Sequence, residues 1–452
     1  MDDDIARKRA ERARRKQSAA QKQENGKEDT SGAIHARSWV PVNSEASGTR
    51  VRVVSWNMLA QCLVRRELFP GSDCLKYRTR FPGIVAEFRS HDFDVGCFQE
   101  VDSINELGPA VQKMGYAYEY ERGYANKKHG LMIAWRSKPG ERPSFQVPIM
   151  KRVLTLDDMA PWDHEVQGPS LTRITRNIAM IVALPFADKE GGIVVATTHL
   201  FWHPRYAYER VRQAAIITHT LNELRQDPQQ PWSKWPIVFA GDLNDQPHSS
   251  SYTLLTGGAD TYMRSMEADL APSRVVHTSV DEARGLRTVH CAATVSEQGD
   301  EDRILGRYRP ALDNELLTVS QLAHCGRFTM EGRPSHFLSA YGSTYASLAE
   351  HGAEFFKDRG NAPERYDQTE SPTPTDPRQL QSCEPKWTLH SSLFRLTLDY
   401  ILLAPNASHE GPDFPTVSSL LILHPESVLH SGVPRLGVCS SDHVMVGAEL
   451  VL

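Results

Sequence analysis

The chain has 452 residues, of which 40% are hydrophobic and 24% are charged, and its formal net charge is −5. This composition is normal for a globular protein and leaves room for one large α/β domain or two domains of ordinary size. No run approaches the roughly 20 apolar residues that would cross a bilayer, and the amino terminus lacks the apolar stretch of a secretory signal. We therefore expect a protein that is neither anchored in a membrane nor secreted.

Seven cysteines are scattered along the chain without a CxxC pair. Their odd number and their spacing fit neither a disulfide framework nor a zinc site. The pattern predicts a reduced, intracellular protein, located in the cytoplasm, the nucleus or both.

Residues 1–47 are polar, charged and nearly free of large apolar side chains, which is typical of a disordered tail. Residues 1–22 of this tail hold eight Lys/Arg against four acids. Such a basic run suits a nuclear address or a contact with nucleic acid, and it suits equally a solvated tail without a specific partner. We expect one folded domain over residues 48–452, whose first strand begins near Arg50.

From Arg50 onward, short β-rich apolar runs alternate with segments of helical spacing. Strands are predicted over residues 52–56, 95–99, 131–135, 178–185, 193–198, 235–239, 396–402, 417–423 and 444–451. Helices are predicted over residues 77–90, 104–114 and 208–225. The turn Gly191-Gly192 predicts antiparallel pairing of the strands on either side of it. Mixed helices and strands with hairpin neighbours favour an α/β sandwich over a purely parallel sheet.

The pattern weakens in an insertion between about residues 262 and 395. We expect this insertion to pack helices, such as one over residues 307–322, around the end of the core. Residues 361–386 are rich in Pro, Thr, Asp and Gln, which predicts a surface loop.

Polar side chains stand where the predicted strands begin or end. They are Asn57, Glu100, His199, Asp242, Asn244, Asp399, Asp442 and His443. Strand ends share one rim of a sandwich, so these groups can converge on a single site. Carboxylates suit Mg²⁺, whereas amides and imidazoles can hold a phosphate. The chain has neither a Walker A loop nor a kinase signature, which leaves metal-assisted hydrolysis of a phosphate ester.

Each of these residues also has a plain structural explanation when it is taken alone. An Asn or Asp after a strand is usually a turn residue or a helix cap, and a single histidine is more often hydrogen-bonded within the core. The ordered set of eight favours the catalytic interpretation over these single explanations.

Six short motifs occur in the order typical of the endonuclease/exonuclease/phosphatase superfamily. They are Ser55-Trp56-Asn57, Phe98-Gln99-Glu100, Thr198-His199-Leu200, Gly241-Asp242-Leu243-Asn244, Leu398-Asp399-Tyr400 and Ser441-Asp442-His443. The linking segments 127–131, 198–204 and 397–401 resemble the nocturnin and carbon-catabolite-repressor deadenylase branch, above all its fungal Ngl-type RNA exonucleases. The resemblance implies a DNase I-like, four-layered α/β sandwich of two mixed, mainly antiparallel sheets between helices.

The resemblance also implies a metal site. Glu100 would be the principal ligand of Mg²⁺, for which Mn²⁺ could substitute, and Asn57 and Asp442 would lie beside it.

A catalytic role follows for five further residues under the same resemblance. Asp242 would orient or deprotonate the attacking water, and Asn244 and His199 would hold the scissile phosphate. Asp399 would orient His443, which would donate hydrogen bonds to that phosphate, because a carboxylate behind an imidazole raises its pKa and fixes its orientation.

Three residues are weaker candidates for binding substrate. Arg205 and Lys128 could contact RNA phosphates, and Trp202 could stack on a base. The alternatives are a solvated helix start, an exposed loop lysine and a packing aromatic, respectively.

The resemblance implies a Mg²⁺-dependent 3′-to-5′ RNA exonuclease that acts on single-stranded 3′ ends as a monomer and releases nucleoside 5′-phosphates. Poly(A) preference and a role in RNA 3′-end processing stay open. Two alternatives remain: a phosphatase of the same fold that removes a 2′-phosphate from a dinucleotide, and a non-catalytic RNA-binding adaptor.

Overall fold

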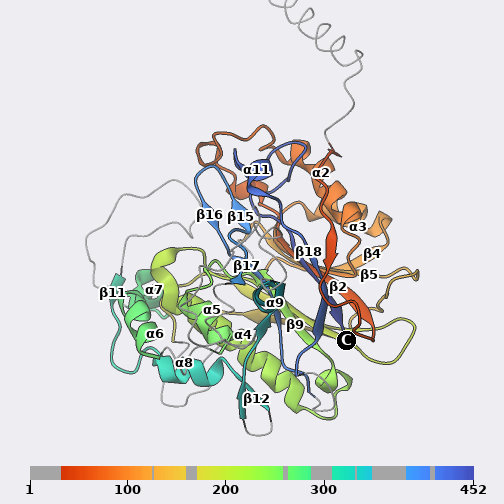
Figure 1. The fold of residues 1–452 in the computed structure, drawn as a ribbon. Coiled ribbons are helices and arrows are strands. Elements are labelled where there is room, and N and C mark those ends of the chain that lie inside the picture. The colour runs from red at the N-terminus through yellow and green to blue at the C-terminus, as the bar shows by residue number, and fades with distance from the viewer. Residues whose placement is uncertain are drawn as a thin grey trace, which may run out of the picture.

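The computed structural model describes residues 32–124, 127–158, 170–257, 263–286, 308–330, 333–348, 383–407 and 413–452. Two β-sheets pack face to face, and helices cover the outer face of each (Figure 1). The prediction of a four-layered α/β sandwich is therefore confirmed.

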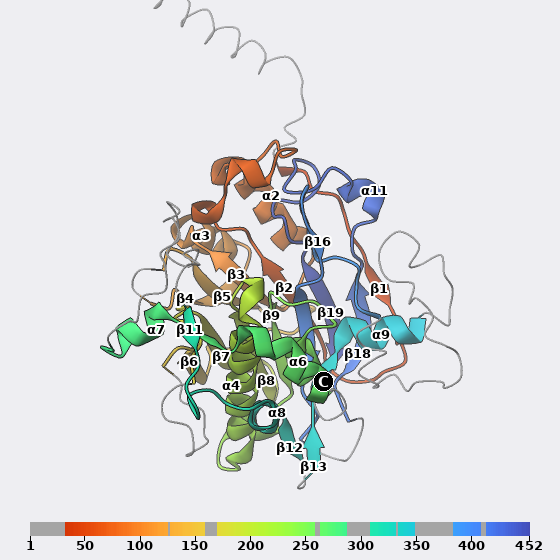
Figure 2. The ribbon, with the colours of Figure 1, turned by 90° about the vertical axis from the view of Figure 1, so that its left-hand side faces the viewer.

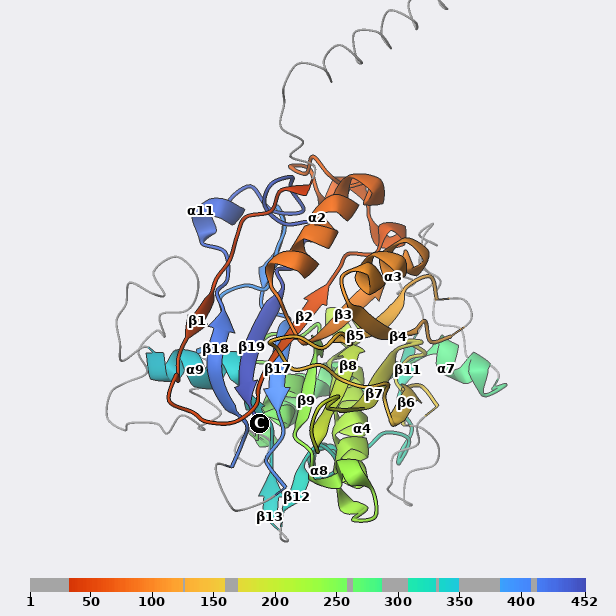
Figure 3. The same ribbon diagram turned by 90° about the vertical axis from the view of Figure 1, so that its right-hand side faces the viewer.

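The first sheet has seven strands. Their order across the sheet is β1 (Trp39–Pro41), β18 (Thr416–Leu421), β19 (Val446–Val451), β2 (Arg50–Asn57), β3 (Val95–Val101), β5 (Gly130–Arg136) and β4 (Tyr116–Glu121). All neighbours are antiparallel except β2 and β3. Helices α2 (Tyr77–Ser90) and α3 (Ile104–Lys113) lie on the outer face of this sheet (Figure 3).

The second sheet has six strands, in the order β14 (Leu338–Ser339), β17 (Asp399–Leu403), β9 (Ile237–Asp242), β8 (Gly192–His199), β7 (Ile178–Pro185) and β6 (Met150–Thr155). Only β8 and β9 run parallel, and the predicted antiparallel pair β7–β8 is confirmed. The long helix α4 (Ala207–Gln226) covers its outer face, with α5 (Ser250–Leu255), α6 (Met263–Leu270) and α8 (Val319–Cys325) packed on α4 (Figure 2).

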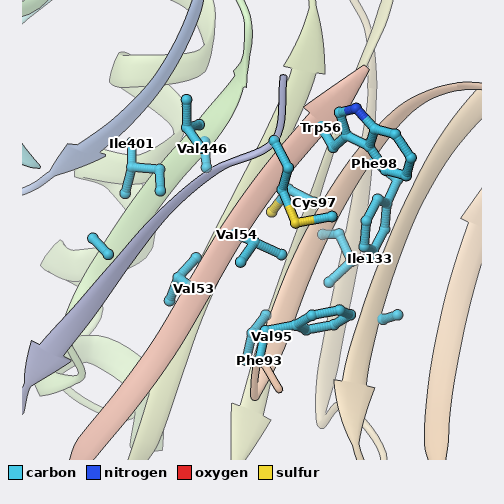
Figure 4. Close-up of a cluster of buried hydrophobic side chains, with 14 of the residues drawn as sticks. Val53, Val54, Trp56, Phe93, Val95, Cys97, Phe98, Ile133, Ile401 and Val446 are labelled. Carbon is cyan, nitrogen blue, oxygen red and sulfur yellow. The ribbon is translucent and has the colours of Figure 1, made fainter. Parts of the chain in front are cut away.

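The main hydrophobic core fills the space between the sheets and continues to α2 and α3 on the outer face of the first sheet. Val53 and Cys97 enter the space between the sheets from the first sheet and Ile401 enters it from the second (Figure 4), whereas Phe98 points outward and stacks on Phe88 of α2. Strand β7 shows how one sequence serves two cores, because Met180 faces the other sheet and Ile181 faces α4. Side chains alternate between the two faces of a strand, and burial on both faces explains why this strand is an unbroken apolar run.

The folded part begins before Arg50, so the predicted boundary of the tail is wrong. Strand β1, which contains Trp39, pairs with β18, and the buried Arg37 donates a hydrogen bond of 2.6 Å to the carbonyl of Met445. A short apolar strand was hidden among polar neighbours, where its pattern was too brief to detect. Residues 1–31 of the predicted tail lie outside the described residues.

The helix predicted over residues 307–322 is also wrong for most of its length. Strand β11 (Tyr308–Pro310) pairs with β10 (Val275–His277), and α8 begins only at Val319. Pro310 cannot donate a helical hydrogen bond, and Thr318 forms a capping box with Gln321 that starts the helix there.

The predicted strand over residues 396–402 is divided, because β16 (Arg395–Leu396) pairs with β15 (Leu389–His390) whereas β17 starts at Asp399. Most of the predicted loop 361–386 lies outside the described residues. Among the helices that the structure describes, none is both long and apolar enough to span a bilayer. The remaining short elements are α7 (Thr278–Ala283), β12 (Phe328–Met330), β13 (Arg333–Ser335), α9 (Ala340–Leu348) and α11 (Glu426–Leu429).

Candidate active site

Strands from both sheets bring polar residues to one end of the sandwich. In the second sheet, His199 at the end of β8 and Asp399 at the start of β17 both lie opposite Asp242 at the end of β9. In the first sheet, Asn57 ends β2 and lies beside the end of β3, which carries Glu100. These five predicted residues therefore converge because their strands are in register.

Asn57 links the carboxylates of the two sheets. Its amide nitrogen donates to Oδ2 of Asp242 at 2.9 Å and to Oε1 of Glu100 at 3.2 Å. The loop after β2 completes the arrangement, since the backbone N–H of Ala60 donates to Oε2 of Glu100 at 2.8 Å. The backbone N–H of Leu59 donates to Oδ1 of Asn57 at 3.0 Å, which fixes the orientation of that amide.

Two site residues have left-handed backbone conformations. Glu100 has φ of 57° and lies at a bulge between β3 and β5, and Asn244 has φ of 49°. Asn244 is held by its N–H to Oδ1 of Asp242 at 2.8 Å and by its side chain to the carbonyl of Leu200 at 2.9 Å. Non-glycine residues in this region are uncommon and concentrate at functional sites.

His443 and Asp399 form a buried pair. Nδ1 of His443 lies 2.8 Å from Oδ2 of Asp399, and Nε2 lies 3.8 Å from Oδ2 of Asp242. Thr388 also donates to Oδ2 of Asp399 at 2.6 Å. Burial opposes the charged imidazole, but Asp399, Asp242 and Asp442 raise the pKa of His443 well above its ordinary value. These carboxylates therefore favour the charged, donating form of the His443 imidazole.

The pKa of His199 shifts in the opposite direction. Its Nε2 lies 3.6 Å from Oδ2 of Asp242 and 4.0 Å from Oε1 of Glu100. Burial nevertheless lowers the pKa of His199 to about 4, against the attraction of Glu100. The site thus combines one charged and one neutral imidazole, an arrangement that separates their roles.

The donor atoms fit a divalent cation. Burial raises the pKa values of Glu100, Asp242 and Asp442, and in Asp242 the charge of Asp399 adds to burial and brings the pKa to about 6. A bound cation favours the charged form of such carboxylates, and hard oxygen donors are what Mg²⁺ prefers.

Two sets of residues could supply the metal ligands. Within the described parts of the chain, Asp242, Asp399 and His443 offer ligand atoms within 4.8 Å of one another. Asp399 and His443 already use their facing atoms for each other, however. Glu100, with Asn57 beside it, is therefore the better centre for a metal site.

All of these groups except Asp399 line one cavity of about 210 Å³. Its apolar lining includes Leu59, Leu63, Leu68, Phe69 and Leu389. Its lining also includes Lys127, His129, Asn177 and the half-exposed Trp202. Of the three predicted substrate-binding residues, only Trp202 lines this cavity. Lys128 and Arg205 are exposed on the surface outside the cavity. The preceding residue Lys127 lines the cavity in place of Lys128, and Arg205 lies in the short helical turn Pro204–Tyr206.

Sequence reasoning missed Asn177, which supports the site from β7. Its side chain donates to the carbonyl of His199 at 2.9 Å and accepts a hydrogen bond of 3.2 Å from Lys127. Asn177 directly precedes a predicted strand that is antiparallel to β8, so the start of β7 lies beside the end of β8. Its position directly before a predicted apolar strand is the signal that could have found it.

Arg80 of α2 joins the loops that carry the site. This side chain is fully buried and donates to the carbonyls of Met58, Leu59 and Ser440. The first two carbonyls follow Asn57, and the third precedes Asp442. Arg80 therefore holds the end of β2 and the approach to β19 in a fixed relation.

Comparison with known proteins agrees with this geometry. The family model described as Endonuclease/Exonuclease/phosphatase family matches residues 54–443. The chain therefore belongs to this family. The crystal structure titled ANGEL2, a 2′,3′-cyclic phosphatase, matches with a TM-score of 0.54 and 19% identity, over 92% of this chain and 98% of that one. This likeness confirms the DNase I-like sandwich.

The chain is also similar to curated fungal proteins. It is 35% identical over 234 residues to RNA exonuclease NGL2 of Saccharomyces cerevisiae, which is 46% of this chain and 43% of the relative. It is 33% identical over 225 residues to Probable RNA exonuclease C9B6.11c of Schizosaccharomyces pombe, or 48% of this chain and 41% of the relative. The resemblance to Ngl-type proteins is confirmed, although the match spans less than half the length of these relatives.

Proposed function

We propose that the chain is a Mg²⁺-dependent 3′-to-5′ RNA exonuclease that releases nucleoside 5′-phosphates from single-stranded RNA. One observation carries the proposal: Asn57, Glu100, His199, Asp242 and His443 all line one cavity, and Asp399 holds His443 from behind. The names of the fungal relatives support RNA as the substrate.

Glu100 and Asn57 would hold the metal ion, with Asp442 beside them. When bound, a divalent cation supplies positive charge to the phosphate and to the leaving oxygen. Because all of these ligands come from one chain, the proposed enzyme needs no second copy to complete its site.

The other residues act on water and phosphate. Asp242 accepts the proton of the attacking water, since it is buried and its Oδ2 faces the cavity beside Asn57. His443 donates to a phosphate oxygen through Nε2 while Asp399 holds Nδ1. Neutral His199 and the side chain of Asn244 hold the remaining phosphate oxygens. Attack in line with the bond to the 3′-oxygen leaves the phosphate on the 5′-oxygen of the released nucleotide.

The cavity also suits a small phosphate ester, because it is a single cavity of about 210 Å³ with both apolar and polar lining beside the catalytic groups. A phosphatase that removes a 2′-phosphate from a dinucleotide is therefore the second candidate. Phosphate release from NADP⁺ tests it directly.

The test uses 5′-labelled oligo(A), oligo(U) and a mixed RNA, incubated with Mg²⁺ or with EDTA. We expect a stepwise ladder of shortened, labelled products that requires Mg²⁺. Attack from the 5′ end would instead release a labelled mononucleotide at once, and an endonuclease would give a few internal fragments.

Glu100→Gln is the informative variant, and Glu141→Gln, at an exposed position, is the matched control. We expect the ladder to disappear in Glu100→Gln and to persist in Glu141→Gln. Release of phosphate from NADP⁺ without RNA cleavage would replace the exonuclease with the phosphatase, and inactivity in both assays would support a non-catalytic RNA-binding adaptor.

A further inference from the structure

A second, cationic pocket opens beside the proposed catalytic cavity. It is a small, open pocket lined by Arg122, Lys127, Arg176, His129, Asn177 and His199, together with glycine and apolar residues at the start of β5 and β7. Among the described residues that line this pocket, none is a carboxylate. Three cationic side chains without an acid make the pocket an attractive place for an anion.

The two spaces adjoin each other. Lys127, His129, Asn177 and His199 line both of them. His199 lies within 4.0 Å of carboxylate oxygens of the catalytic cluster. An anion in the cationic pocket would therefore lie directly beside a phosphate in the catalytic cavity and would belong to the same substrate.

The backbone at the edge of the cationic pocket is strained at Arg176. Arg176 has φ of 57°, and the buried carboxylate of Asp157 holds this turn by accepting from the N–H of Arg176 at 2.6 Å and of Thr175 at 2.9 Å. A strained non-glycine residue that a buried carboxylate holds in place is typical of a functional position.

Arg122 reaches the same pocket through a close approach of two strands. Gly130 starts β5, and a Cβ at this position would lie 2.2 Å from the carbonyl oxygen of Glu121 and 2.8 Å from Cα of Arg122. Only glycine allows the end of β4 to lie this close to β5. The approach brings Arg122 to the pocket from one side, while Arg176 lines it from the start of β7.

We propose that the cationic pocket binds the phosphate on the 5′ side of the bond that is cleaved, one nucleotide upstream. This inference rests on the proposed exonuclease function. When the last phosphodiester of a strand occupies the catalytic cavity, no phosphate follows it, so the neighbouring phosphate is the upstream one. The enzyme would therefore bind its substrate through two phosphates and would cleave a dinucleotide that carries only one phosphate less efficiently.

The test compares the dinucleotides pApA and ApA, which share the same scissile bond and differ only in the upstream phosphate. We expect wild-type kcat/KM to be at least about tenfold higher for pApA, as the loss of one or more charge-assisted hydrogen bonds implies. Arg122→Gln and Arg176→Gln should each reduce this ratio toward one. Arg122 is exposed, so its variant should fold even if the turn at Arg176 is sensitive to change.

Arg152→Gln is the control, because Arg152 is a half-exposed arginine of β6 that pairs with Glu223 and does not line the pocket. This variant should keep the wild-type ratio. Cleavage of both dinucleotides at equal rates, or a preference that survives both pocket variants, would overturn the inference while the exonuclease stands. Failure to cleave any RNA would instead remove the proposed function and the inference together.

Discussion

Replacing Asp399 with Asn removes the charge behind His443 and leaves the shape of the site nearly unchanged. The bond between Oδ2 of Asp399 and Nδ1 of His443 is 2.8 Å long and fully buried. Such a charge-assisted hydrogen bond contributes about 1.5–3 kcal/mol. If it orients and charges the imidazole in the transition state, its loss should lower kcat about 10- to 150-fold.

The pH dependence gives this prediction a second readout. Burial lowers the pKa of His443 and the three neighbouring carboxylates raise it well above its ordinary value, with Asp399 the largest of them. Without the charge of Asp399 the pKa falls, so fewer molecules carry the charged imidazole as pH rises. The activity ratio of wild type to Asp399→Asn should therefore increase between pH 6 and 8.

Steady-state rates on a labelled RNA across this pH range provide the assay. Asp188→Asn, in the exposed turn at the opposite end of β8, is the matched control and should match wild type at every pH. Wild-type kcat in Asp399→Asn, or a loss that does not change with pH, would refute the assigned role of the pair.

Three further variants test the scaffold. Arg80→Ala removes three buried hydrogen bonds to carbonyls and should cost about 3 kcal/mol in the free energy of unfolding, measured with urea; a cost below about 1 kcal/mol would contradict its linking role. Gly241→Ala would place a Cβ 2.4 Å from the carbonyl oxygen of Thr198, so we expect loss of activity and a lower Tm, and an active, stable variant would count against this packing. Burial raises the pKa of Glu384 to about 7, so the Glu384 carboxyl keeps its proton to a higher pH in the folded state than in the unfolded state. The free energy of unfolding of the wild type should therefore fall by about 3 kcal/mol as pH rises from about 4.5 through 7. Glu384→Gln should weaken that fall while keeping an acceptor for Tyr252, and an unchanged pH dependence would refute the assignment.

Long, regular elements could be predicted from the sequence because burial of one face of a helix, or of both faces of a strand, leaves a clear pattern. The helix predicted over residues 77–90 matches α2, and the strand over residues 178–185 matches β7. Strand β4 was missed because its residues are mostly half-buried and alternate tyrosines with glutamates, which resembles a polar loop. Strand β1 was missed because three residues carry too little periodicity.

The candidate site could be predicted only where polar residues adjoin apolar strands. Asp242 and His443 stand out for this reason. The cavity lining depends instead on which distant segments the fold brings together, as when Phe69 and Trp202 line the same cavity. To predict that Lys127 lines the cavity and Lys128 does not, one must know the direction of each side chain at the turn before β5. A single sequence does not contain this information.

The chemistry of the released product tests the proposed exonuclease most directly. RNA would be digested in water enriched in ¹⁸O, and the mononucleotides would be analysed by mass spectrometry. We expect nucleoside 5′-phosphates that carry one ¹⁸O on phosphorus, because water attacks the phosphate and the 3′-oxygen leaves. Products with a 3′-phosphate or a 2′,3′-cyclic phosphate, or 5′-phosphates without the label, would contradict the proposed reaction.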